Sequence, residues 1–496
     1  MSQREREARR QRLEALRAQG IDPYPARVGA REPIESICAR FGARDTESLE
    51  ADPQHVGVAG RILALRSFGK LVFATLLENG ARIQISARRS EIEPELFEFV
   101  KAVDVGDFLW IAGPVWRTQK GELTVDVREA RLLAKGLRPL PEKWHGLTDV
   151  EARFRQRYLD LLVNEDARRI AVQRSRIVSA MRAFLDGRGF LEVETPVLQP
   201  LYGGAAARPF TTHHNTYDQD LYLRISDELY LKRLVVAGID RVYEIGRVFR
   251  NEGVSRKHNP EFTMMECYQA YADYRDMMEL TQSMVQEIAE RVLGSTHIQF
   301  QGQAIELGGE WARRSLRDAI GEATSIDILA HADLGALREA VRAAQLEIDE
   351  APTWGRLVDA IFSTAVEPTL IQPTLITDYP LELSPLAKRS PVDPRLVERF
   401  EPFVAGMEIA NAFSELNDPD DQRARLESTM RDREAGDEEA HPLDEDYLQA
   451  LEVGMPPTGG LGVGVDRLVM ILTDAASLRE VIAFPHMRPT DPTVES

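Results

Sequence analysis

The sequence predicts an α+β protein with two folded parts, a small N-terminal β-barrel and a larger domain in which helices flank a sheet. Three observations predict this class. The chain has 496 residues, which is longer than one hydrophobic core usually serves. Residues 56–133 alternate as short strands, whereas helical periodicity and strand-like runs mix beyond residue 150. Between the two parts, residues 135–141 break the periodicity with glycine and prolines and indicate a linker.

Composition excludes several classes of protein. The 43% hydrophobic and 28% charged content is ordinary for a globular protein, and no run approaches the roughly 20 apolar residues of a membrane span. The two cysteines, Cys38 and Cys267, are too few for a disulfide scaffold or a cysteine-rich zinc site. Residues 1–12 are charged and lack the apolar core of a signal peptide. We therefore expect a cytoplasmic protein.

We assign residues 1–50 to an N-terminal helical extension that is rich in arginine. The formal net charge of −19 means that a nucleic acid would have to meet a local basic patch. One candidate patch is a helix-forming stretch that ends at Gly20 and carries Arg4, Arg6, Arg9, Arg10, Arg12 and Arg17. These arginines either contact phosphates without sequence preference or form a solvated helix face.

Residues 51–135 are expected to form the barrel. Alternation of apolar and polar residues is clear in 81–86 and 123–127, and a helix-like stretch, 90–103, interrupts the strands. Five strands with a helix between the third and the fourth are typical of an OB-fold, which often binds oligonucleotides. A structural barrel without a ligand is the alternative, because a fold does not fix a function.

A linker at 136–150 leads to the larger domain, 151–496. Helices are expected at 151–162 and 167–186, and strands at 190–195, 221–225 and 241–249. A helical insertion is expected around 315–367, and an acidic surface loop at 431–446.

A strand, polar loop and strand around residues 249–266 hold unlike chemical groups together. Arg250 offers a planar fork for a phosphate or carboxylate, Glu252 accepts from an amine, and Phe262 offers a flat face for a base. A nucleotide would satisfy all three. The alternative is an ion-paired surface hairpin with Phe262 in the core.

Three acidic residues, Glu401, Glu408 and Glu415, recur every seven residues on a segment that alternates like a strand. A regular strand would not place all three on one face, so a bend or bulge is needed if they converge. Two carboxylates can share Mg²⁺ with phosphates, because this ion prefers oxygen ligands. The alternative is an acidic helical stripe that faces water, which the apolar neighbours Ile409 and Phe413 disfavour.

A glycine-rich strand that turns into a helix follows at residues 459–472. Its small residues let a ligand approach the backbone, and Arg467 at the start of the helix can meet a phosphate. Gly462 and Gly464 lack the third glycine of a dinucleotide-binding fingerprint.

These segments resemble the class II aminoacyl-tRNA synthetases. FRNE at 249–252 with the downstream Glu266 resembles motif 2, GVGVDR at 462–467 resembles motif 3, and GFLEVETP at 189–196 resembles motif 1, the usual dimer interface. The HIGH and KMSKS signatures of class I are absent. The N-terminal barrel is similar to the anticodon-binding domain of subclass IIb. From the barrel to Arg488, the chain is most similar to the lysine-specific branch of that subclass.

The resemblance implies that lysine and ATP form lysyl-adenylate and pyrophosphate, and that lysine then passes to the 3′ end of tRNA(Lys). It implies a homodimer through motif 1 and Mg²⁺ on Glu401 and Glu408. The implied catalytic residues are Arg250, His258 and Arg467. The implied ATP-binding residues are Arg250, Glu252, His258, Phe262, Glu401 and Arg467. The implied lysine-binding residues are Gly204, Glu228, Arg250, Glu266, Tyr268, Asn411, Phe413 and Glu415. Phe73 and Gln84 are the implied anticodon contacts, although Phe73 is equally expected in the barrel core.

Substrate choice also follows from the residues themselves. A lysine pocket must pair two ammonium groups, and Glu228, Glu266 and Glu415 supply carboxylates. An aspartyl or asparaginyl enzyme is the nearest alternative, but Glu228 would repel an acidic side chain. A noncatalytic relative would usually lose the motif arginines, whereas Arg250 and Arg467 are present. Transfer to an acceptor other than tRNA is a further alternative, which the barrel disfavours.

Overall fold

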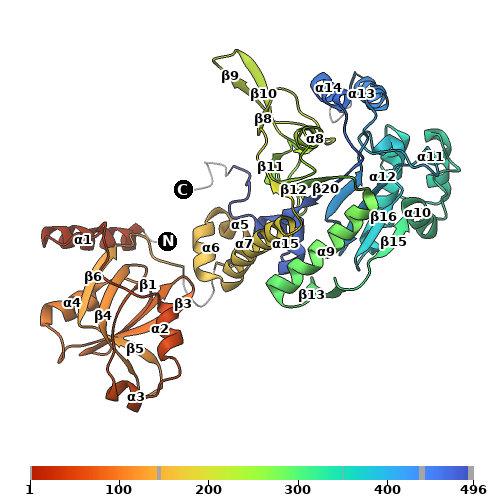
Figure 1. The fold of residues 1–496 in the computed structure, drawn as a ribbon. Helices are drawn as coiled ribbons and strands as arrows, with labels where there is room; N and C mark the ends of the chain where they lie inside the picture. The colour runs from red at the N-terminus through yellow and green to blue at the C-terminus, as the bar shows by residue number, and fades with distance from the viewer. Residues whose placement is uncertain (1–2, 142–146, 350, 435–441, 490–496) are drawn as a thin grey trace. The chain divides into compact units, whose positions relative to one another are not determined.

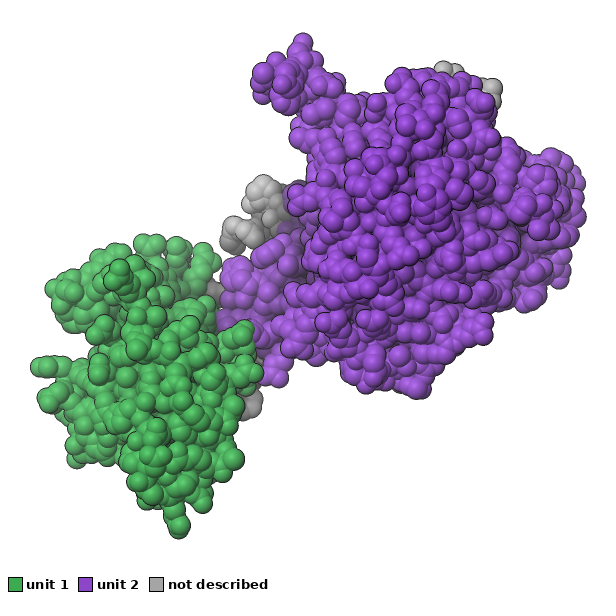
Figure 2. All heavy atoms as spheres, viewed as in Figure 1, with its two compact units in different colours: residues 1–146 green, residues 147–496 purple. Residues whose placement is uncertain are grey.

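The chain forms two units, residues 1–146 and 147–496, which are described separately (Figures 1 and 2). The computed structural model describes residues 3–141, 147–349, 351–434 and 442–489. Part of the predicted linker, 142–146, and part of the predicted acidic loop, 435–441, lie outside the described residues. No helix in the described ranges is long and apolar enough to span a membrane.

The N-terminal unit is built on a closed barrel. Its strands are β1 (His55–Ser67), β2 (Leu71–Glu78), β3 (Ala81–Arg88), β4 (Phe108–Arg117), β5 (Leu123–Asp126) and β6 (Glu129–Ala134). Because β1 pairs with both β2 and β4, the order β1-β2-β3-β5-β4 closes on itself. Helix α4 (Pro94–Ala102) lies between β3 and β4. Strand β6, which pairs with β4, is additional to the five expected strands.

Three helices precede the barrel, α1 (Gln3–Ala18), α2 (Ile34–Phe41) and α3 (Thr46–Ala51). The arginines of α1 do not share one role. Arg9 is only 4% exposed, and its Nη1 donates to the carbonyl oxygens of Val105 (3.0 Å) and Gly136 (3.1 Å). Arg12 pairs with Asp104. Neither expectation for the arginine cluster holds for Arg9, because this side chain anchors the helix to the barrel.

A large sheet organises the second unit. Its strand order is β15-β16-β17-β19-β20-β12-β11-β7, with β18 paired to β17, and its neighbours are antiparallel except β15 with β16 and β11 with β7. The strands are β7 (Leu191–Glu192), β11 (Arg241–Phe249), β12 (Glu261–Ala270), β15 (Ala312–Ser315), β16 (Thr374–Thr377), β17 (Arg399–Val404), β18 (Met407–Glu408), β19 (Ala410–Ser414) and β20 (Thr458–Gly464). The predicted α+β class is confirmed.

Helices α7 (Glu165–Asp186), α9 (Tyr274–Leu293) and α15 (Val465–Thr473) gather on one side of this sheet (Figure 1). They form the main core with Met265 and Cys267 of β12 and Leu461 and Val463 of β20. Helices α8 (Glu228–Val236) and α14 (Glu445–Val453) pack together and share a second core with Tyr268 of β12. The other face of the central strands is thereby left for a pocket.

The remaining elements surround these layers. They are helices α5 (Val150–Arg155), α6 (Arg157–Val163), α10 (Leu316–Thr324), α11 (Leu334–Ala343), α12 (Trp354–Ala365), α13 (Pro419–Glu434) and α16 (Leu478–Val481), 3₁₀ turns η1 (Glu367–Thr369) and η2 (Leu381–Leu383), and strands β8 (Leu198–Gln199), β9 (Thr211–His214), β10 (Gln219–Leu223), β13 (His297–Phe300) and β14 (Gln303–Glu306). Helices α10, α11 and α12 share a hydrophobic cluster of their own.

Three local predictions differ from the structure. The helix expected at 151–162 is divided at Gln156, whose backbone leaves the helical region. The strand expected at 190–195 is reduced to β7, because the backbone N–H and hydroxyl of Thr195 donate to the side chain of Glu244 instead of to a strand. The loop expected at 431–446 is wrong at both ends, since α13 continues to Glu434 and α14 begins at Glu445.

Candidate active site

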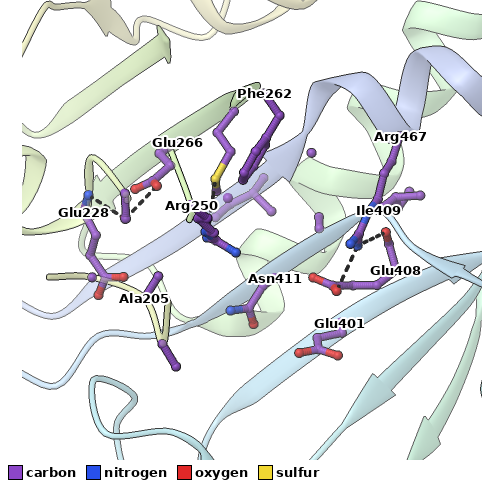
Figure 3. A pocket seen from close by; sticks show the side chains of 18 of the residues that line it. Ala205, Glu228, Arg250, Phe262, Glu266, Glu401, Glu408, Ile409, Asn411 and Arg467 are labelled. Carbon is purple, nitrogen blue, oxygen red and sulfur yellow. Dashed lines mark hydrogen bonds and ion pairs between the residues drawn. The ribbon is translucent and has the colours of Figure 1, made fainter. Parts of the chain in front are cut away.

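A cavity of about 530 Å³ lies over the central strands of the large sheet. It is lined by every residue that the sequence predicted for catalysis, ATP, the amino acid and the metal, namely Gly204, Glu228, Arg250, Glu252, His258, Phe262, Glu266, Tyr268, Glu401, Glu408, Asn411, Phe413, Glu415 and Arg467. In Figure 3, Glu228 and Glu266 lie toward one end, Glu408 and Arg467 toward the other, and Arg250 between them. The fold therefore brings together segments that are more than 200 residues apart in the chain.

Strand β12 supplies both the pocket and the core. Side chains alternate between the two faces of a strand, and the pocket face carries Phe262, Met264, Glu266 and Tyr268. Met265 and Cys267 point the other way, into the main core. The pocket residues are therefore held by the same strand that is fixed by core packing.

Strand β20 makes room for these side chains. Gly460, Gly462 and Gly464 stand opposite Tyr268, Glu266 and Met264 in the register with β12. A Cβ atom at Gly460 would lie only 1.9 Å from Oε1 of Glu415 and 2.7 Å from the Tyr268 ring. The glycines thus serve side chains of neighbouring strands, in addition to the expected approach of a ligand.

Glu266, at the end of the pocket where Glu228 also lies, is held by three hydrogen bonds. It accepts from the hydroxyl of Ser226 (2.8 Å), the backbone N–H of Asp227 (3.1 Å) and the hydroxyl of Tyr268 (3.1 Å). Burial, with the nearby charge of Glu228, raises the pKa of Glu266 to about 7. The Tyr268 hydroxyl, which the resemblance pairs with a substrate ammonium, is thus shared with Glu266.

Glu228 and Glu415 are joined by a buried cation. Lys232 is 0% exposed, and its Nζ forms ion pairs with both carboxylates. Apart from this contact with Lys232, the described part of the chain offers the oxygens of Glu415 no hydrogen bond. Burial raises the pKa of Glu415 well above its usual range. The sequence-based prediction missed Lys232, although a lysine between Leu231 and Val235, one helical turn after Glu228, was a signal for it.

Arg250 faces the middle of the pocket as a largely uncommitted cation. Its guanidinium lies 5.2 Å from the ring centroid of Phe262, and its Nε donates to the carbonyl of Ile225 (3.4 Å). No carboxylate forms an ion pair with it among the described residues. Burial lowers its pKa, but an arginine remains protonated near neutral pH. An anionic ligand would supply the missing partner.

Arg467 and His258 lie at the far end of the pocket. Nη1 of Arg467 donates to the backbone carbonyl (2.9 Å) and Oε2 (3.1 Å) of Glu408, and Nη2 lies 3.5 Å from Nε2 of His258. Nδ1 of His258 lies 2.9 Å from the hydroxyl of Ser255. Desolvation and the charge of Arg467 lower the pKa of His258, which favours a neutral imidazole. Glu252 is exposed on the same loop.

The acidic segment is a folded hairpin and not a single bent strand. Glu401 lies on β17, and a turn with positive φ at Ala405 (55°) and Gly406 (67°) returns the chain so that Glu408 pairs with Phe403. Glu415 follows β19. The seven-residue spacing therefore crosses a turn, which is how the three carboxylates reach one cavity.

Glu401 and Glu408 suit a divalent cation by their donor chemistry. Glu401 accepts from the hydroxyl of Tyr379 (2.7 Å) and pairs with Arg399, and burial raises its pKa to about 7. Arg399, a second residue that the sequence-based prediction missed, also donates to Oδ1 of Asn411 (2.9 Å). No group of three or more His, Cys, Asp or Glu side chains sized for a metal occurs in the described ranges. An ion here would need further oxygens from phosphates or water.

The two predicted anticodon contacts lie on the other unit. Phe73 is half-buried on β2 between the buried Val72 and Ala74, so it is outside the barrel core. Phe73 lies opposite Ser86 of β3, and Gln84 is two residues before Ser86 on that strand. Nε2 of Gln84 donates to the hydroxyl of Thr124 (2.9 Å). The two side chains are diagonal neighbours on one face of the barrel wall.

Comparison with known proteins gives two family matches. Residues 149–488 match the tRNA synthetases class II (D, K and N), and residues 56–133 match the OB-fold nucleic acid binding domain. A lysine–tRNA ligase of Roseiflexus sp. (strain RS-1) is 56% identical over 482 residues, 97% of this chain and 98% of that protein. Lysine–tRNA ligases of Bacillus subtilis (strain 168) and Staphylococcus aureus (strain MRSA252) are 50% and 49% identical, with 97% of each chain covered.

Proposed function

The chain belongs to the class II tRNA synthetases of the D, K and N group, and we propose that its pocket activates lysine with ATP and loads it onto tRNA. It is a lysine–tRNA ligase, like the relatives that share half or more of its sequence over nearly its whole length. One observation of the site carries the choice of lysine. Three buried carboxylates, Glu228, Glu266 and Glu415, line one end of a cavity whose middle is occupied by an unpaired arginine.

The first step needs no protein nucleophile. A carboxylate oxygen of lysine attacks the α-phosphorus of ATP, the bond from that phosphorus to the bridging oxygen breaks, and pyrophosphate leaves. Arg250 meets the lysine carboxylate and the α-phosphate, so that it neutralises charge where the new bond forms. The terminal ribose hydroxyl of tRNA then attacks the lysyl carbonyl and releases AMP.

The far end of the pocket receives the nucleotide. His258 and Arg467 meet the outer phosphates, Phe262 stacks on adenine, and Glu252 accepts from the adenine amine. For Arg467 to reach a phosphate, it must share or give up its contact with Glu408.

Glu401 and Glu408 would hold Mg²⁺ beside the phosphates. When bound, the ion supplies positive charge that offsets the outer phosphates. The support is the pair of carboxylates at the phosphate end, one of which is so poorly solvated that its pKa is raised to about 7.

The other end of the pocket holds lysine. Glu228, Glu266 and the Gly204 backbone take the α-ammonium, and Glu415 and Tyr268 take the ε-ammonium, while Asn411 and Phe413 complete the wall. Gly204 has φ +86°, and a Cβ there would lie 2.7 Å from the Ser226 hydroxyl. Glu228 and Glu415 share one buried cation, Lys232, so a neutral side chain would leave the buried carboxylates without the second positive charge that the ε-ammonium supplies, which is costly.

Further assignments follow from this activity. The barrel face with Phe73 and Gln84 reads the anticodon by stacking and hydrogen bonding. Two copies pair through the segment around β7, which is supported by the exposed apolar side chains of Leu191, Val197 and Leu198. The protein acts in the cytoplasm, where tRNA is charged for protein synthesis.

Exchange of labelled pyrophosphate into ATP tests the choice of amino acid. We expect exchange with lysine and none above background with aspartate or asparagine. Exchange that aspartate drives and lysine does not would contradict the proposal. Charging of tRNA(Lys) transcript with labelled lysine then tests the second step, and exchange without charging would point to another acceptor.

A further inference from the structure

Lys232 occupies an unusual place behind the wall of the pocket. It does not line the cavity itself, whereas its two ion-pair partners, Glu228 and Glu415, do. Three rings surround its Nζ, with centroids at 5.5 Å for Phe413, 5.9 Å for Tyr447 and 6.0 Å for Tyr268. The lysine therefore places a fixed ammonium directly behind the groups that meet the substrate.

The charged and titratable groups around Lys232 come from five elements. They are Glu228 on α8, Glu266 and Tyr268 on β12, Glu415 after β19, Tyr447 on α14, and Arg399 on β17, which acts on Glu228. Three carboxylates at close quarters in a buried site favour uptake of protons, because each charge opposes the others. A protonated carboxyl group is a poor partner for an ammonium group.

The positive charge of Lys232 opposes this uptake of protons by the carboxylates. With Glu228, Glu266 and Glu415 ionised, the cluster including Lys232 carries two negative charges. Free lysine brings two ammonium groups, and its carboxylate faces Arg250. With Lys232 present, the cluster therefore has a net charge of minus two, which the two ammonium groups of the substrate neutralise.

We propose that Lys232 is a positioning residue for amino-acid recognition, whose buried ammonium keeps Glu228 and Glu415 ionised and fixed in place for the two ammonium groups of lysine. This inference rests on the proposed function. The ammonium reaches Glu228 because the two residues are one helical turn apart on α8, and it also pairs with Glu415, which follows β19. Glu415 depends on it most, since the described residues offer its oxygens no hydrogen bond other than the contact with Lys232.

The test is the pH profile of lysine use in Lys232→Met, which removes the charge and keeps an unbranched side chain that is one atom shorter. Lysine-dependent pyrophosphate exchange is measured from about pH 6 to about pH 9, with ATP and lysine varied separately. We expect the KM for lysine to rise about tenfold or more near neutral pH, and the KM for ATP to change less than about twofold. The acid limb of kcat/KM for lysine should move up by about one pH unit, because carboxyl groups that lose a cation hold their protons to higher pH.

Two variants serve as references. Lys232→Arg keeps the charge and should retain the position of the acid limb even where its greater volume raises the KM. Arg233→Met removes a cation one residue along the same helix, where Arg233 pairs with Asp444 and Asp446 away from the cavity, and should match the unmodified enzyme.

The outcomes separate the possibilities. The inference would be overturned if the acid limb of Lys232→Met lay at the same pH as that of the unmodified enzyme. It would also be overturned by a lower KM for lysine, because Lys232 would then compete with the substrate. Should Lys232→Met fail to fold, Glu228→Gln is compared with Glu228→Gln/Lys232→Met. The double variant removes both charges of the Glu228–Lys232 ion pair, so neither is left buried without the other. The acid limb of kcat/KM for lysine should lie at higher pH in the double variant, because Glu415 has lost its cation. Acid limbs at the same pH in the two variants would overturn the inference. Absence of lysine-dependent exchange in the unmodified enzyme would instead refute the proposed function.

Discussion

At the scale of single residues, Glu415 offers the sharpest test of amino-acid recognition. It is 1% exposed and lies at the end of the pocket away from Arg467. We expect Glu415→Gln to lower kcat/KM for lysine about 100-fold, since a charged hydrogen bond to an ammonium group is lost in a buried site. The KM for ATP should stay within about threefold in the exchange assay. Equal losses for both substrates would contradict the assigned role.

Glu266 predicts a pH dependence. Its pKa of about 7 means that it is ionised above pH 7 and protonated below it, whereas both ammonium groups of lysine remain charged across this range. Lysine use should therefore weaken as the pH falls, with kcat/KM about tenfold lower at about pH 6 than at about pH 8. Lysine titrations at fixed ATP measure this, and a flat profile would show that Glu266 stays ionised.

Gly460 predicts a steric effect. Gly460→Ala would place a methyl group 1.9 Å from Oε1 of Glu415, so Glu415 or β20 must move. We expect a loss of about 1 to 3 kcal/mol in the free energy of unfolding together with a raised KM for lysine. Gly321→Ala on α10 is the control, because the added Cβ there would lie 3.8 Å from the carbonyl oxygen of Ile326 and Gly321 does not line the cavity. Chemical denaturation and the exchange assay give the two readouts.

Residue types and spacing, together with the resemblance to the class II synthetases, predicted many of the residues that line the pocket, but not their pairing with other side chains of the protein. Arg250, Phe262 and Glu415 were found because each carries a group that ATP or lysine requires. Lys232 and Arg399 were missed because they bind other side chains of the protein. Such partners depend on which strands and helices become neighbours, and a single sequence does not state this.

At the scale of elements, Asp466 ties three of them together. Its Oδ2 accepts from the backbone N–H of Thr263 on β12 (2.7 Å), and its Oδ1 lies 2.5 Å from Nη1 of Arg174 on α7. Asp466→Ala would leave Arg174 without its carboxylate partner, although Arg174 also donates to the Thr263 hydroxyl (3.1 Å), and we expect a loss of about 3 kcal/mol in the free energy of unfolding. Asp166→Ala on α7 removes the exposed pair with Arg169 and should cost less than about 1 kcal/mol. Similar losses in the two variants would argue against the anchoring role.

Long periodic elements were predicted more reliably than their junctions. Strand β11 and helix α7 lie close to their predicted bounds because their hydrophobic patterns are continuous. The hairpin at Ala405 and the break at Gln156 were not located. At such places the backbone conformation is chosen by tertiary contacts and not by local periodicity.

At the scale of the whole molecule, the cavity that we propose for amino-acid activation and the barrel that we propose for anticodon recognition lie in different units. The variant Phe73→Ala tests this separation, because Phe73 belongs to the barrel unit and the cavity belongs to the other unit. We expect this variant to lose about tenfold in kcat/KM for tRNA(Lys), in line with one lost stacking contact. Pyrophosphate exchange without tRNA should be unchanged. With a tRNA of altered anticodon, the variant and the unmodified enzyme should converge, and a persistent difference would place Phe73 outside base recognition.

The architecture of both units followed from the sequence because each has its own pattern, short alternating strands in one and mixed helices and strands in the other. The barrel itself was predicted, but the pairing of β1 with β4 that closes it, and the order of the nine strands in the large sheet, were not. Strand order is set by contacts between residues far apart in the chain, which local periodicity leaves open.

The glycines of β20 determine where this pocket can change. Where β20 faces the neighbouring Tyr268 and Glu266 it carries only glycine, so it adds no polar group there and selection among amino acids falls to the strands on either side. An attempt to redesign the enzyme for a different amino acid would keep Gly460 and Gly462 and vary Glu266, Tyr268 and Phe413. Substitution of these three side chains, with the glycines of β20 kept, would change the specificity of the pocket and leave the core packing on the other face of the sheet intact.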